Sequence, residues 1–120
     1  MNDLEKDSLE SLKLAMRQFA QDREWDKFHS PKNLSMALAG ETAELLDCFR
    51  WLTEEASYGL DAEQMSAVKD ELADVLLFTV RLADKLNVDL FTAAQAKMAK
   101  NAERYPTEKV KGSAKKYNQY

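Results

Sequence analysis

The stretch that decides the fold is DAEQMSAVKDELADVLLFTVRLADKL, residues 61–86. Asp61 and Gln64 have the spacing of a capping box, which predicts a helix from Asp61 to about Leu86. Apolar residues recur on two sides of this predicted helix: Val68, Leu72, Val75, Leu82 and Leu86 on one, and Ala73, Leu77 and Val80 on the other. A helix that is apolar nearly all round belongs inside an assembly, so the pattern predicts an oligomer. The alternative is a helix at the centre of a monomeric bundle.

Three further helices are predicted around this one. They cover roughly residues 4–21, 31–53 and 89–105. Ser30 and Pro31 form a helix start signal, and Asp89 is a further N-cap. Because 120 residues include only 3 glycines and 2 prolines, the chain has few turn formers and favours long helices. We therefore expect an all-α four-helix bundle completed by oligomerisation, with one domain over residues 1–105 and a lysine-rich tail over residues 106–120.

Composition narrows the function classes. Hydrophobic residues make up 45 % and charged residues 32 % of the chain, which excludes a disordered protein. The single cysteine, Cys48, excludes a disulfide framework and a Cys-based zinc site, and the single histidine, His29, excludes a His-rich metal centre. No apolar run reaches the ~18 residues of a membrane span, and the first residues lack the apolar region of a signal peptide. The expected location is the cytoplasm, without membrane contact.

The charge balance bears on the partners. The net charge is −4, from 17 basic and 21 acidic residues, which argues against a nucleic acid as the partner. Residues 106–120 hold four lysines and one glutamate, or +3, so the other 105 residues sum to −7. These 105 residues carry enough negative charge to repel phosphate groups, unless a divalent cation lies between the protein and the phosphates.

Two pairs of carboxylates are the most informative feature. Glu41 and Glu44 lie three residues apart, as do Glu71 and Asp74, so each pair shares a helix face. The acids border apolar stripes, where burial raises the pKa of a carboxyl unless a cation holds it ionised. Mg²⁺ prefers such oxygen ligands and also binds substrate phosphates. The alternative is two solvated acidic faces. Gly40 in mid-helix indicates a close approach of a second helix or a ligand.

Two other groups of side chains are candidates for binding. Lys97, Asn101 and Arg104 fall on one polar stripe suited to phosphate oxygens, although a solvated face has the same pattern. Trp51 has the flat ring needed to stack on a base; otherwise it is a core tryptophan. His29, in an aromatic loop, either contacts a base or makes a local hydrogen bond.

The runs REWDKFHSPKNLSMALAGETAELLDCFRW, DELADVLLF and KMAKNAERYP resemble the MazG-type all-α nucleoside triphosphate pyrophosphohydrolases, in their dCTP pyrophosphatase-like branch. The resemblance covers about residues 9–106. It implies hydrolysis of a (d)NTP to the monophosphate and pyrophosphate with Mg²⁺, for which Mn²⁺ can substitute, in a homodimer or a homotetramer, the tetramer being favoured. Its implied role is housecleaning of the nucleotide pool.

The resemblance also implies roles for single residues. Glu41, Glu44, Glu71 and Asp74 match the family's metal ligands, and either Glu41 or Glu44 is expected to activate the attacking water. The positions that match substrate-binding residues are Trp25, His29 and Trp51 around the base, Phe78 near the sugar, and Lys97, Asn101, Arg104 and Tyr105 on the phosphate and sugar side.

Two departures from the family pattern bear on the substrate. Phe78 stands where relatives often carry Tyr, and Met16 stands where some carry His. dCTP or a modified dCTP is the expected substrate. The alternatives are a related pyrophosphohydrolase for dUTP or a damaged nucleotide, and a non-catalytic helical dimer that binds a nucleotide.

Overall fold

The computed structural model describes residues 8–114, and every regular element in that range is helical. In chain order the elements are α1 (Leu9–Asp22), the 3₁₀-helix η2 (Asp26–Phe28), α2 (Pro31–Asp47), α3 (Glu54–Ser57), α4 (Ala62–Lys85), α5 (Leu90–Arg104) and α6 (Thr107–Val110). The four long helices α1, α2, α4 and α5 confirm the all-α prediction. The predicted start of the first helix at residue 4 lies outside the described residues.

The helix starts follow the capping signals in the sequence. Ser30 Oγ accepts the backbone N–H of Asn33 at 3.1 Å, and Asp89 Oδ1 accepts that of Thr92 at 2.9 Å. At the start of α4 the predicted capping box is complete: Asp61 Oδ1 accepts the Gln64 N–H at 2.8 Å, and Gln64 Oε1 accepts the Asp61 N–H at 2.9 Å. Each cap satisfies backbone donors that have no partner within the helix.

The predicted end of the second helix, near Thr53, is wrong. α2 ends at Asp47, because the next N–H groups bond three residues back instead of four: Cys48 to Leu45 O at 3.1 Å and Phe49 to Leu46 O at 2.9 Å. Such bonds tighten the chain into a turn. Thr53 then caps the short helix α3 through its hydroxyl, which accepts the Ala56 N–H at 3.1 Å.

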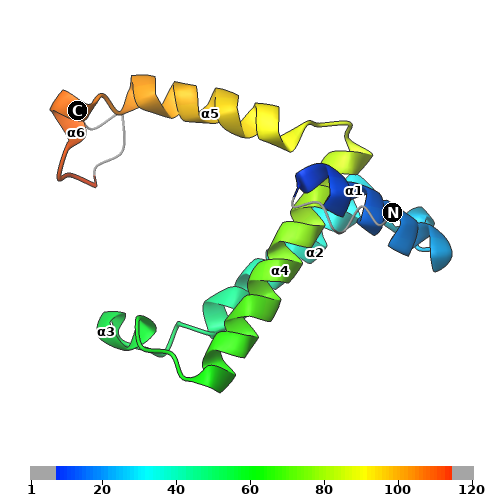
Figure 1. The fold of residues 1–120 in the computed structure, drawn as a ribbon, viewed down its shortest axis with the longest axis horizontal. Coiled ribbons are helices and arrows are strands. Elements are labelled where there is room, and N and C mark those ends of the chain that lie inside the picture. Colours follow the sequence, from blue (N-terminus) through cyan, green and yellow to red (C-terminus); the bar gives the residue numbers. More distant parts are fainter. Residues whose placement is uncertain (1–7, 115–120) are drawn as a thin grey trace. The chain divides into compact units, whose positions relative to one another are not determined.

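The chain divides into two units, Met1–Val88 and Asp89–Tyr120. In the first, α4 lies along α2 and also packs against α1 (Figure 1). The buried apolar side chains at these contacts are Ala20, Leu34, Val68, Val80 and Ala83. The second unit contains α5 and α6, of which α6 was not predicted. The single domain over residues 1–105 stays a prediction.

Part of the apolar surface of α4 is left uncovered by the described residues of the first unit. Met65, Leu72 and Leu76 fall on one face of the helix at spacings of seven and four residues, and they are 42 %, 52 % and 42 % exposed. Packing on α1 and α2 therefore accounts for only one side of this helix. None of the described helices is both long and apolar enough to cross a membrane.

Candidate metal and nucleotide site

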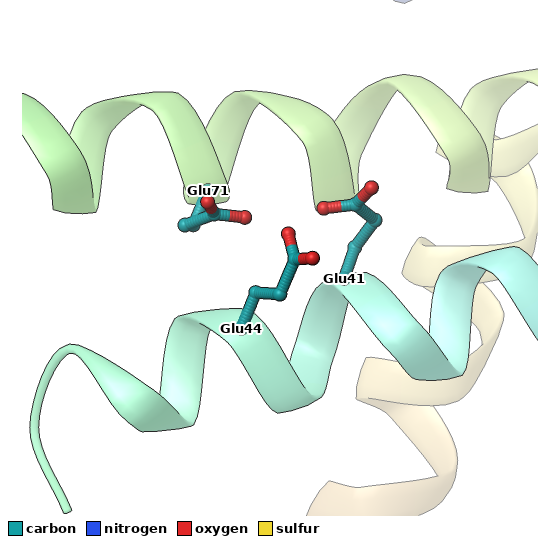
Figure 2. Close-up of side chains that lie close together, drawn as sticks. All are labelled: Glu41, Glu44 and Glu71. Carbon is teal, nitrogen blue, oxygen red and sulfur yellow. The ribbon is translucent and has the colours of Figure 1, made fainter.

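Three of the four predicted carboxylates converge between α2 and α4. Glu41 and Glu44 extend from α2 toward α4, and Glu71 extends from α4 toward α2 (Figure 2). One oxygen of each carboxylate lies within 4.8 Å of one oxygen of the other two. The spacing of three residues puts Glu41 and Glu44 on the same helix face, and the side-by-side packing of the helices brings Glu71 opposite them.

Two oxygens in this cluster are buried without a partner. Glu41 Oε2 and Glu71 Oε2 have no hydrogen-bond partner among the described residues. A buried carboxylate oxygen without a partner is unfavourable, since it has lost its water and gained nothing in return. The two oxygens thus fit a cation that prefers oxygen ligands, as the sequence predicted. Glu44 is more exposed, so the cluster is open on one side.

The electrostatics of the cluster agree with this geometry. Burial, followed by the neighbouring Glu44 carboxylate, raises the pKa of Glu41 to about 7. The same two causes raise the pKa of Glu71. Without a cation, the protein reduces the repulsion by holding a proton in the cluster.

Asp74 is not one of the three converging carboxylates, although its charge acts on them. It lies one helical turn after Glu71 and is half-buried, and its carboxylate contributes to the raised pKa values of both Glu41 and Glu71. Its role as a fourth metal ligand stays a prediction. Gly40, beside Glu41, has nothing within 4 Å of where a Cβ would lie, so among the described residues of the first unit no second helix packs closely against it.

The raised pKa of Glu41 predicts how the metal-free protein responds to pH. The pKa of Glu41 is about 7 in the folded protein and near 4.5 in the unfolded chain. The folded state therefore binds the proton of Glu41 more tightly than the unfolded chain does, and protonation stabilises the fold. Its contribution to the free energy of unfolding should therefore fall as the pH rises from about 4.5 to 7. Thermal unfolding in EDTA at a series of pH values measures this. In Glu41→Gln the fall should be smaller, and identical pH profiles of the two proteins would contradict the assignment.

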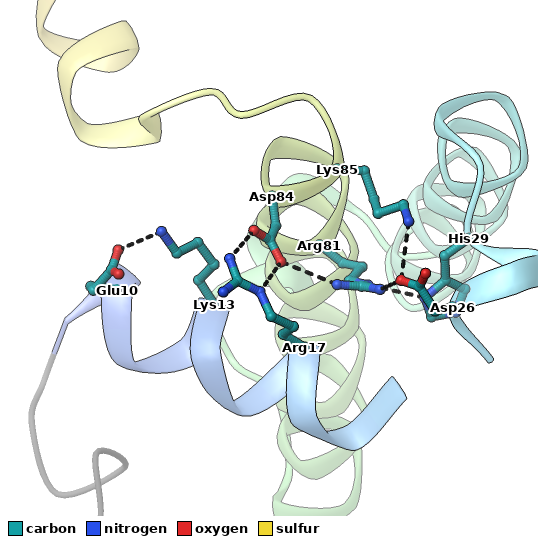
Figure 3. Close-up of polar contacts among 8 residues, drawn as sticks. All are labelled: Glu10, Lys13, Arg17, Asp26, His29, Arg81, Asp84 and Lys85. Carbon is teal, nitrogen blue, oxygen red and sulfur yellow. Dashed lines mark hydrogen bonds and ion pairs between the residues drawn. The ribbon is translucent and has the colours of Figure 1, made fainter. Parts of the chain in front are cut away.

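A second polar network lies at the C-terminal end of α4, and the sequence reasoning missed it (Figure 3). The Arg81 guanidinium donates to Asp26 in η2 and to Asp84 Oδ2, the latter at 3.1 Å. Asp84 also accepts two hydrogen bonds from Arg17 of α1, at 2.6 and 3.1 Å. Lys85 donates to Asp26 at 3.0 Å. The sequence feature that could have revealed this network is the position of Arg81 between Val80 and Leu82, in the apolar part of the predicted helix.

The predicted base-binding residues are far apart within one chain. Trp25 and His29 precede α2, whereas Trp51 follows it. The 17 residues of α2 span about 25 Å at ~1.5 Å per residue. Trp25 packs edge-on against Phe19, with 5.7 Å between ring centroids. One chain therefore does not close all three rings around a base, and a shared pocket requires a second copy.

The remaining predicted binding residues lie on two helices. Phe78 is half-buried on α4, in the first unit. Lys97, Asn101 and Arg104 lie along α5, and Tyr105 is its C-cap, all in the second unit. Their spacing places the first three on one face of α5, as predicted. Contact between these four residues and the nucleotide stays a prediction.

Comparison with known proteins supports the interpretation. Residues 37–119 match the model of the MazG-like family. The chain is 39 % identical to human dCTP pyrophosphatase 1 over 114 residues, and 40 % identical to the mouse protein of that name over 112. These alignments cover 93 % and 92 % of this chain, and 67 % and 66 % of the relatives.

The fold has a counterpart of known structure. A pyrophosphatase from Archaeoglobus fulgidus superposes with a TM-score of 0.77 at 35 % sequence identity, over 81 % of this chain and 91 % of that one. The chain belongs to the MazG-like family of all-α proteins, which confirms the resemblance seen in the sequence.

Proposed function

We propose that this protein is a metal-dependent nucleoside triphosphate pyrophosphohydrolase that converts dCTP, or a modified dCTP, to the nucleoside monophosphate and pyrophosphate. The relatives bear out the class of enzyme predicted from the sequence. The single observation that carries the metal-dependent chemistry is the convergence of Glu41, Glu44 and Glu71, with two of their oxygens buried and unpaired. In the cell, such an enzyme would remove unwanted nucleotides from the pool.

The cation best suited to the cluster is Mg²⁺, with Mn²⁺ as a substitute. Glu41, Glu44 and Glu71 would hold it, and Asp74 would complete the ligand set. When bound, the cation supplies charge neutralisation for the triphosphate and lowers the pKa of water. The three carboxylates would otherwise repel the triphosphate, which is a polyanion. The donors are all carboxylates, the ligand type that hard divalent cations prefer.

The chain's own residues would carry the other parts of the reaction. Either Glu41 or Glu44, through an oxygen not engaged by metal, would accept the proton of the water that attacks the α-phosphorus. Lys97 and Arg104 would neutralise the charge that develops on the pyrophosphate leaving group. Asn101 and Tyr105 would help to hold the phosphates and the sugar.

The base would be held by Trp25, His29 and Trp51. Because a single chain separates these residues by the length of α2, the pocket would use residues of more than one copy. Phe78 lacks the hydroxyl that a tyrosine would offer to the sugar, so the preference for deoxyribose would rest on other contacts. We propose a homotetramer, with a dimer as the smaller form, located in the cytoplasm and acting without nucleic acid or membrane.

A hydrolysis assay across canonical and modified dNTPs and NTPs tests the proposal. Added inorganic pyrophosphatase converts the pyrophosphate product to phosphate, which is then measured with Mg²⁺ and without it. We expect Mg²⁺-dependent release with dCTP or a 5-substituted dCTP as the best substrate. Highest activity on dUTP or a damaged nucleotide would overturn the base assignment. Binding without release for every nucleotide would identify a non-catalytic protein.

Trp51→Ala should raise the Michaelis constant for dCTP about 10-fold or more. That factor corresponds to a loss of ~1.4 kcal/mol, within the ~1–3 kcal/mol that stacking on a base contributes. Trp51 is 85 % exposed in the single chain, so the change removes little internal packing. Tyr58→Ala is the matched control, because Tyr58 lies on the same connection and is 92 % exposed. An unchanged Michaelis constant in Trp51→Ala would show that this ring does not hold the base.

A further inference from the structure

Arg81 is only 1 % exposed and connects α4 to η2 and its C-cap residue His29, all in the first unit. Its Nη1 donates to Asp84 and its Nη2 to Asp26, while its Nε donates to Nδ1 of His29 at 3.1 Å (Figure 3). The planar guanidinium fixes the directions of all its N–H groups together. The hydrogen bonds to Asp26 and Asp84 therefore fix the plane of the guanidinium, and with it the direction in which Nε–H points at His29.

This contact determines which nitrogen of His29 carries the proton. Arginine stays protonated in proteins, so its Nε–H is always a donor and Nδ1 of His29 must be the acceptor. In a neutral imidazole with an unprotonated Nδ1, the proton is on Nε2. Among the described residues, no group forms a hydrogen bond with Nε2 of His29. This nitrogen also does not belong to the side-chain atoms that are buried without a partner. Its N–H is therefore available to a ligand.

We infer that Arg81 is a positioning residue that holds His29 as the neutral Nε2–H tautomer, so that His29 offers a hydrogen-bond donor to the edge of the nucleobase. The second half of this inference rests on the proposed function. A donor at this position pairs with an acceptor of the base, which in cytosine is O2 or N3. It does not pair with the exocyclic amine, which is itself a donor.

The charges around His29 favour the neutral ring. Burial, followed by the positive charge of Arg81, lowers its pKa, and Lys85 adds to this effect. Asp26 acts in the opposite direction and raises the pKa of His29. Since a protonated Nδ1 would direct a second N–H at Arg81, the hydrogen-bond geometry and the net charge act together to keep Nδ1 unprotonated.

The tautomer can be measured directly, because His29 is the chain's single histidine. ¹⁵N NMR of the imidazole in the free protein at pH 7 should show a protonated Nε2 and an unprotonated Nδ1, and titration should give a pKa below 6.5. A proton on Nδ1, an even mixture of tautomers or a charged ring at pH 7 would overturn the inference. This measurement needs neither substrate nor a variant.

Variants of the network separate positioning from general structural support. Arg81→Lys keeps the charge but has one nitrogen in place of the three that bond Asp26, Asp84 and His29 in fixed directions, so the two tautomers should mix. Asp26→Asn keeps the Arg81 contact to His29 and should lower the pKa of His29 further, with the Nε2–H tautomer retained. Lys69→Met, on the exposed side of α4 about 18 Å along the helix from Arg81, should change neither. An unaltered tautomer in folded Arg81→Lys would overturn the role of Arg81.

The contact with the base is tested by adding a non-hydrolysable analogue, α,β-imido-dCTP, with Mg²⁺. The Nε2–H signal should shift with saturable dependence on the analogue, and dCTP should compete. If the wild type hydrolyses dCTP but the signal does not move, the contact with the base is refuted while the proposed function stands. If no nucleotide is hydrolysed, the proposed function fails, and the free-protein spectrum still decides the tautomer.

Discussion

Glu71→Ala is expected to lower the rate of dCTP hydrolysis by at least ~10²-fold at saturating Mg²⁺, and Glu41→Ala, Glu44→Ala and Asp74→Ala should do the same. A factor of this size is typical for a group that stabilises charge or transfers a proton in the transition state. The expectation follows from the convergence of Glu41, Glu44 and Glu71 between two helices. Near-wild-type turnover in two of the four variants would contradict the site.

The Glu71→Ala variant has a second expected signature that separates loss of chemistry from loss of fold. It removes a buried unpaired oxygen and a carboxylate that repels Glu44. In EDTA the variant should therefore unfold at the same temperature as the wild type or at a higher one. Asp70→Ala is the matched control, because Asp70 is an exposed acid one residue away, outside the cluster. It should retain activity.

Leu76→Asp is expected to dissociate the assembly. Met65, Leu72 and Leu76 form an uncovered apolar face on α4, and a second copy is the partner that the proposed function requires for the base pocket. In a symmetric contact each copy loses the burial of a half-exposed leucine, about 1 kcal/mol, and gains an interfacial carboxylate. The two copies together should raise the dissociation constant by more than ~100-fold.

Analytical ultracentrifugation at micromolar protein measures this effect. The wild type should show no major folded monomer, and a stable 13.7 kDa wild-type species would contradict the prediction. Ala62→Asp is the matched control, because it adds the same charge at the first residue of α4, where an acid suits the positive end of the helix. It should assemble like the wild type. If Leu76→Asp loses both its assembly and its hydrolysis activity, the result would support a pocket built from more than one copy.

The helix starts could be predicted because they depend on local chemistry. Ser30, Asp61 and Asp89 each bond a backbone N–H three residues on, and such bonds do not depend on the rest of the fold. The end of α2 could not be predicted in this way. Cys48 to Leu52 contains no glycine or proline, and the change to shorter-range hydrogen bonds there has no local sequence signal.

The site was predictable in part for the same reason. The i, i+3 spacing placed Glu41 and Glu44 on one face, but only the packing of α4 on α2 shows that Glu71 lies opposite them and that Asp74 lies outside the converging group. The network around Arg81 was missed because a buried arginine needs polar partners, and two of its partners are distant in the sequence. Asp26 is 55 residues away and His29 is 52. The separation of Trp25 from Trp51 already follows from the predicted helix over residues 31–53, but the three rings were grouped by the resemblance without regard to that length.

The position of the carboxylates within two helices determines which changes of chain length the protein can tolerate. Deleting one residue within α2 or α4 would rotate everything beyond it by about 100° around the helix axis and shift it by about 1.5 Å. Such a deletion between Glu71 and the Asp61 cap would turn either the acid or the apolar contacts away from α2. The connection between α2 and α4, residues 48–61, carries none of the three converging acids. Insertions in MazG-like chains should therefore accumulate in this connection and be excluded from both helices.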